Sequence, residues 1–182
     1  EKCKSLAIKS NGKILLGGYG QENGNDKSYF ILAQYNDDGT LDSTFGIGGK
    51  VIGRAGKANS MMIQSDGKIL LGGSYNFNFA LVRYHANGTL DSTFGTGGEV
   101  ITAVGSSSEG NALSIQSDGK IVLGGYADAG FALVRYNNDG TLDNTFGIGG
   151  KVIGSPGKAN TLTIQSDGKI LIGGASNSTI AL

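Results

Sequence analysis

A seven-residue phrase recurs along this chain and constrains its fold more than any other feature. The phrase is Ile-Gln-Ser-Asp-Gly-Lys-Ile at residues 63–69, 115–121 and 164–170, and Ile-Lys-Ser-Asn-Gly-Lys-Ile at residues 8–14. A second phrase, Gly-Thr-Leu-Asp-x-Thr-Phe-Gly, begins at Gly39, Gly88 and Gly140. Copies of this kind form an array in which each unit packs on the next, because one unit alone buries too little apolar surface.

The repeated unit is 49 residues long, which is the separation of the equivalent glycines Gly119 and Gly168. Earlier copies are longer only because of insertions, one within residues 19–29 and one after Phe94. The sequence therefore predicts a single repeat domain over residues 1–182, with units starting near residues 5, 60, 112 and 161.

Short apolar runs bounded by turn residues recur in every unit, and no segment shows the apolar spacing of a helix. The third unit reads as four strands, at about residues 112–116, 120–123, 131–136 and 151–153. An Asp-Gly pair predicts a two-residue hairpin turn between the first two strands, since glycine readily adopts a positive φ. These structural turn residues are Asp66, Gly67, Asp118, Gly119, Asp167 and Gly168.

The second and third strands of each unit are apolar on both faces, as in the run Ile121-Val122-Leu123. A sheet of this kind has to be covered on both faces, and in an array the neighbouring sheets supply the cover. The prediction is an all-β fold, a β-propeller of four-stranded blades of about 49 residues. A glycine pair, such as Gly124-Gly125, is expected to end the second strand and to allow close backbone approach or a bulge.

The order of these phrases, with Phe-Ala-Leu-Val-Arg-Tyr-Asn between the glycine pair and the second phrase, resembles the bacterial delta-sixty repeat. That β-propeller repeat family has no assigned function, and the resemblance covers essentially the whole chain. It implies a bacterial, often large and surface-associated protein, hence an extracellular or cell-surface location, and it brings no catalytic residues. The first copy departs from the pattern at Lys9, Asn11 and Gln34, which suggests a terminal or edge blade.

The chain holds about 3.7 blades, whereas a closed propeller needs at least about four. Two interpretations remain open. Either the natural chain continues and this is a fragment, or a second copy completes the ring as a homo-oligomer. An unpaired strand at the open edge would favour such association.

Antiparallel strand order places the connections of variable length on one rim of the predicted propeller. Loops on a rigid scaffold commonly carry recognition, and aromatic rings with amide groups suit a carbohydrate or a protein surface. The expected ligand-binding residues are Tyr19, Asn23, Tyr29, Tyr75, Asn76, Phe77, Tyr126 and Asp128. The alternative is that these loops are merely solvated.

Composition argues against several functions. Fifteen basic and fifteen acidic residues give no net charge, so no nucleic acid partner is expected. No apolar run approaches the roughly 18 residues of a membrane span, and Cys3 is the single cysteine. Because His85 is the only histidine and no nucleophile–base pair recurs, the sequence predicts a non-enzymatic protein without cofactors.

Aspartates in the second phrase could suggest calcium, but calcium loops need several alternating oxygen ligands and usually a bidentate glutamate. No metal site is therefore predicted. Asp42, Asp91 and Asp143 are instead expected to be structural turn residues that accept backbone N–H bonds. Arg83 and Arg135 are expected to pair with the aspartate of their own unit.

Overall fold

The structure is a computed structural model that describes residues 1–21, 27–176 and 179–181. The described residues form strands and turns, without helix, in four sheets that we call blades 1 to 4. Blade 1 contains β1 (Lys2–Ile8), β2 (Ile14–Gln21), β3 (Ser28–Tyr35) and β4 (Lys50–Ala55). Blade 2 contains β5 (Lys57–Ile63), β6 (Ile69–Tyr75), β7 (Asn78–Tyr84) and β8 (Glu99–Thr102). Blade 3 contains β9 (Ser108–Ile115), β10 (Ile121–Ala127), β11 (Gly130–Tyr136) and β12 (Lys151–Pro156), and blade 4 contains β13 (Lys158–Ile164), β14 (Ile170–Ser176) and β15 (Thr179–Ala181).

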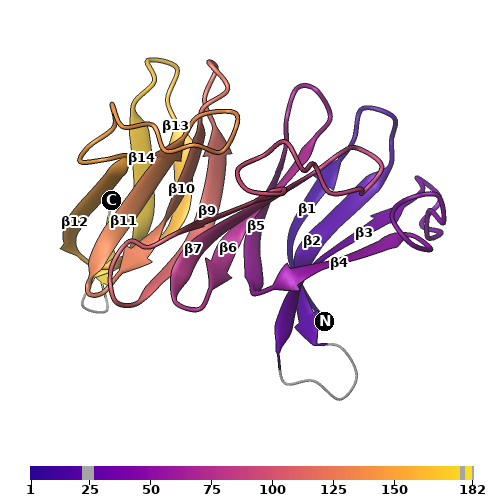
Figure 1. Cartoon of the computed structure of the whole chain (residues 1–182), viewed down its shortest axis with the longest axis horizontal. Helices are drawn as coiled ribbons and strands as arrows, with labels where there is room; N and C mark the ends of the chain where they lie inside the picture. The colour runs from indigo at the N-terminus through magenta and orange to yellow at the C-terminus, as the bar shows by residue number, and fades with distance from the viewer. Residues whose placement is uncertain (22–26, 177–178, 182) are drawn as a thin grey trace.

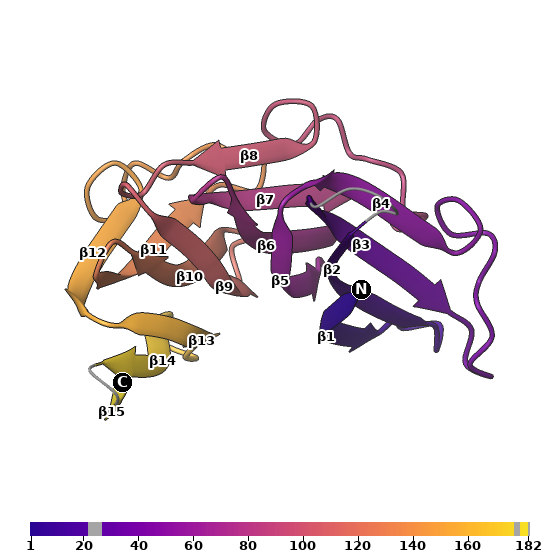
Figure 2. The ribbon, with the colours of Figure 1, turned by 90° about the horizontal axis from the view of Figure 1, so that it is seen from below.

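Each blade is an antiparallel meander in which the strands follow their order along the chain. The blades stand side by side along an arc, with β1, β5, β9 and β13 on its inner side (Figures 1 and 2). This arrangement confirms the all-β propeller prediction, although the described sheets do not close into a ring. The second strand of each blade is longer than the sequence suggested, because the glycine pair continues it.

The paired glycines lie inside the second strand, so the prediction that they end it is wrong. Backbone pairing needs no side chain, and Gly124 pairs with Leu133 and Gly125 with Ala132 in the middle of β10. A Cβ on the first glycine would meet a leucine of the next blade. The pairs are Gly17 with Leu71 at 3.0 Å, Gly72 with Leu123 at 2.9 Å and Gly124 with Leu162 at 2.9 Å. In blades 1, 2 and 3, the first glycine of the pair therefore leaves a hole that a leucine of the next blade fills.

The second glycine of each pair faces a β-bulge in the first strand of its own blade. A Cβ on Gly73 would overlap the Lys57 carbonyl, next to the bulge at Asn59. A bulge leaves its extra residue free to point elsewhere, and the Asn59 amide donates to the Gly110 carbonyl of blade 3 at 2.9 Å. Asn111 repeats this bond to Ala159 of blade 4 at 2.9 Å. The glycine pair thus allows two separate contacts between blades.

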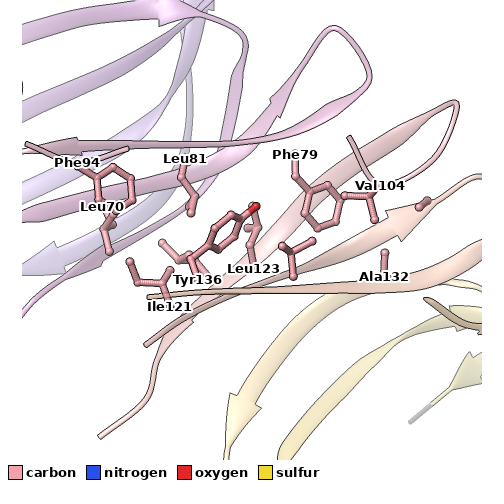
Figure 3. Close-up of a cluster of buried hydrophobic side chains, with 12 residues drawn as sticks. Leu70, Phe79, Leu81, Phe94, Val104, Ile121, Leu123, Ala132 and Tyr136 are labelled. Carbon is pink, nitrogen blue, oxygen red and sulfur yellow. The ribbon is translucent and has the colours of Figure 1, made fainter. Parts of the chain in front are cut away.

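Buried side chains fill the space between the blades. Phe79 and Leu81 of β7 belong to one cluster with Leu123 and Tyr136 of blade 3 (Figure 3). The alternate residues of β7, Ala80 and Val82, belong to the cluster shared with blade 1. Both faces of the sheet are covered by its neighbours, as the two-sided apolar pattern predicted.

Aspartates and cations stabilise the rim that carries the Asp-Gly turns. Asp91 is fully buried; it accepts the Thr93 amide at 3.1 Å and Arg83 Nε at 2.8 Å. Burial alone would raise the pKa of Asp91, but these partners outweigh it and hold that pKa well below the usual range. Arg135 and Asp143 repeat the pair at 2.8 Å, whereas Asp42 of blade 1 accepts from Gln34 and Lys13, each at 2.6 Å.

Replacing Gly73 with alanine should destabilise the protein strongly, because the new methyl group overlaps backbone rather than a movable side chain. We expect a loss of about 3 kcal/mol in the free energy of unfolding, measured by chemical denaturation. The matched control is Gly154→Ala in β12, where a Cβ meets only the Phe131 Cβ at 3.8 Å. A control loss as large as that of Gly73→Ala would contradict the close-approach account.

Candidate functional site

A pocket of about 490 Å³ lies between blades 1, 2 and 3 on the rim formed by the second-to-third strand hairpins and the connections between blades. This rim is at the bottom of Figure 1. Four of the eight predicted ligand-binding residues line the pocket, namely Tyr75, Asn76, Phe77 and Tyr126. The structure therefore brings half of the predicted set together.

The β6–β7 hairpin projects at the edge of this pocket. Only Asn76 and Phe77 separate β6 from β7, because Tyr75 pairs with Asn78 across the hairpin. Both turn residues have left-handed φ angles, 46° and 60°. That conformation is unfavourable for a bulky residue.

Phe77 is fixed through its backbone and leaves its ring free. Its carbonyl accepts the Ser108 amide and the Ser108 hydroxyl, each at 2.8 Å, while its side chain is 71% exposed. Backbone strain of this kind persists only where the surroundings impose it, and it is common at ligand-binding sites. The hairpin therefore holds an exposed aromatic ring at the pocket.

A carboxylate in the pocket is held by two neighbours. Glu109 Oε2 accepts the Tyr126 hydroxyl at 3.1 Å, and Glu109 Oε1 accepts the Asn59 amide at 3.0 Å. Burial and the adjacent Glu109 carboxylate raise the pKa of Tyr126, so the phenol stays protonated as the donor. Each carboxylate oxygen can accept a further bond, which makes Glu109 a positioned acceptor for a ligand hydroxyl or amine.

Cations surround the same pocket. Lys27 and Lys57 line it, and Lys158 lies 4.3 Å from the centroid of the Tyr126 ring. Arg54 lies 4.2 Å from the Tyr75 centroid and also pairs with Glu99. These cation–π contacts restrict the two tyrosine rings.

The other predicted site residues lie outside the pocket. Tyr19 lines a separate hollow on blade 1, with Lys2 and Lys4 5.9 and 5.8 Å from its ring centroid. Tyr29 is the second residue of β3 and does not line the pocket, and Asn23 lies outside the described residues. The Asp128 carboxylate accepts the amides of Ser106 and Ser107 at 3.0 and 3.1 Å. Asp128 thus fixes the connection that precedes β9.

Sequence reasoning missed Lys57 and Glu109, which occupy equivalent positions at the start of the inner strands. A signal was present, because Glu109 falls within the segment of variable length and replaces the lysine found in the other copies. Lys27 carried no comparable signal, since it follows an insertion present only in blade 1.

The single histidine of the chain lies away from the pocket. His85 is on the opposite rim, where its Nε2 is 3.8 Å from the Asp91 carboxylate. Over residues 1–21, 27–176 and 179–181, no group of three histidine, cysteine or carboxylate side chains could hold a metal ion. The described part of the chain contains no helix long and apolar enough to cross a membrane.

Comparisons with known proteins agree with this architecture. The chain is similar to a protein of unknown function from Bacteroides caccae, whose crystal structure was determined at 1.35 Å, with a TM-score of 0.59 and 14% sequence identity. The match covers 94% of this chain and 53% of the other, so the chain spans about half the length of that solved protein. At this identity the likeness shows the fold alone. No curated protein matches the sequence.

A family model described as "Domain of unknown function (DUF5122) beta-propeller" matches four segments, residues 9–45, 64–94, 116–146 and 165–181. These segments make up more than half of the chain, and each begins within or next to a copy of the seven-residue phrase. The chain therefore belongs to this family of β-propeller repeat domains of unknown function.

Proposed function

We propose that this β-propeller repeat domain is a non-enzymatic binding module of a secreted or surface bacterial protein, of the delta-sixty type, and that the rim pocket binds a glycan. The observation that carries the proposal is the exposed Phe77 ring, fixed by a strained hairpin beside the positioned Glu109 carboxylate. Sugars bind in this way, with their apolar faces on aromatic rings and their hydroxyls on fixed acceptors.

The shape of the site favours a glycan over a protein surface. The pocket volume of about 490 Å³ lies in the ordinary range for small-ligand sites, roughly 300–1,000 Å³. A protein partner would instead be expected to cover a broad and flat area. Protein binding at this rim is accordingly an alternative outcome of the tests.

The described side chains of the pocket support binding without catalysis. Among them, the nucleophile candidates are serines and tyrosines, and none is a histidine. Glu109 is the one carboxylate among the described lining residues, and it is bonded to an amide and a phenol rather than to a serine. General acid–base chemistry on glycosides ordinarily needs two carboxyl groups.

Phe77→Gly provides a test with two opposite readouts. Glycine adopts the left-handed φ without strain, and the exposed Phe77 ring buries little apolar surface. The free energy of unfolding of the variant should therefore be about 1 kcal/mol higher than that of the parent protein. Glycan binding, screened on an array and measured by calorimetry, should weaken at least tenfold because the stacking surface is removed.

The matched control is Ile47→Ala, which removes a 91% exposed side chain from the opposite rim and should leave binding unchanged. Binding that survives Phe77→Gly, or that falls equally in the control, would contradict a site at this pocket.

A second candidate function is self-assembly through the open faces of the outer blades. Among described residues, a Cβ on Gly173 of blade 4 would meet only the Thr161 methyl group, so this hole lacks the leucine that fills the others. On blade 1, Leu6 is 60% exposed and occupies the position that Leu162 has in β13. The hole of one copy thus complements the leucine of another.

Light scattering coupled to size exclusion should then show a dimer or larger species for this chain, and Leu6→Asp should convert it to a monomer. Ile47→Asp is the matched control, because it places the same charge at an exposed isoleucine away from the blade faces. A parent chain that is monomeric at micromolar concentrations would exclude self-assembly.

A further inference from the structure

Lysine predominates at one repeat position on the pocket rim. In each blade, one residue near the start of the inner strand pairs with the residue that follows the glycine pair of the second strand. This shared pairing makes the four positions equivalent. The residues are Lys2, Lys57, Glu109 and Lys158. The strands that carry these residues, β1, β5, β9 and β13, line the inner side of the arc (Figure 2). Lys57 and Glu109 line the pocket, whereas Lys2 lines the separate hollow on blade 1.

The negative charges near this row are already engaged. Glu109 accepts from Tyr126 and Asn59, and Glu99 is paired with Arg54. Glu1 lies 3.6 Å from the Lys50 ammonium. These three carboxylates therefore already have partners within the described part of the chain.

Lys57 differs from the other cations of the pocket. Its residue lines the pocket and is exposed, and its side chain makes no hydrogen bond, ion pair or ring contact with any described residue, although its backbone pairs with Ser74. Lys158, by contrast, lies over the Tyr126 ring at 4.3 Å. The pocket therefore combines an uncommitted ammonium group, an exposed aromatic ring and a positioned hydroxyl acceptor.

We propose that the ligand of this pocket is an acidic saccharide, whose carboxylate pairs with Lys57 while a sugar ring stacks on Phe77 and a hydroxyl donates to Glu109. The inference rests on the proposed glycan-binding function. Glu109 explains why a sugar acid fits better than a simple anion, because a carboxylate repels anions but accepts hydroxyl groups. A nucleic acid would meet a chain with no net positive charge.

The test uses pairs of oligosaccharides that differ only in charge. Oligogalacturonate, oligoglucuronate and oligomannuronate are arrayed beside the same chains with their carboxyl groups reduced to alcohols. At least one acidic member should bind 10-fold to 100-fold more tightly than its reduced partner, since a charge-assisted hydrogen bond is lost on reduction. The difference should shrink at high salt.

Lys57→Gln should abolish this preference and Lys57→Arg should restore it. The control is Lys120→Gln, which makes the same substitution on the opposite rim, where Lys120 pairs with Asp118 at 2.7 Å. Equal binding of acidic and reduced chains, or a preference that persists in Lys57→Gln, would overturn the acidic-saccharide inference and leave glycan binding standing. Absence of binding to every glycan on a broad array would overturn both proposals.

Discussion

The fit of a leucine into a glycine hole on the next blade is the contact on which the rest of the structure depends. Leu123 fits against Gly72 because that position carries no side chain, since an added Cβ would lie only 2.9 Å from the Leu123 side chain. The neighbouring glycine leaves room for the bulge at Asn59. The Asn59 amide then bonds to blade 3. Steric fit and hydrogen bonding thus set the distance between adjacent sheets at the inner side of the arc, where their apolar faces meet.

This rigid inner framework lets the two rims serve different purposes. On one rim, buried aspartates and their arginine, lysine or glutamine partners hold the long turn of blades 1, 2 and 3 in place. On the other rim, hairpins and connections vary in length and composition. The strained Asn76-Phe77 turn is held there by Ser108, across the boundary between blades 2 and 3. A candidate binding site consequently forms where blades meet rather than within one blade.

Much of this architecture could be predicted from the sequence, because repetition aligns three or four copies of each turn and strand. The two-sided apolar runs predicted the stacked sheets, and Arg83 with Asp91 predicted the ion pair. Strand ends were wrong at the glycine pairs, since side-chain patterns do not report backbone pairing through residues such as Gly124. The pocket was only half predicted. The aromatic content of the loops indicated Tyr75, Phe77 and Tyr126, whereas Lys57 and Glu109 come close to these rings only because the blades are arranged along a curve.

Native-state hydrogen exchange on Leu123→Ala most directly tests whether blades depend on one another through these contacts. The truncation removes the side chain that fills the hole at Gly72 in the neighbouring blade. The account predicts that amide protection falls together in β5 and β6 of blade 2 and in β9 and β10 of blade 3. Loss of protection confined to blade 3, with blade 2 unchanged, would show that the blades are independent units and would contradict the account.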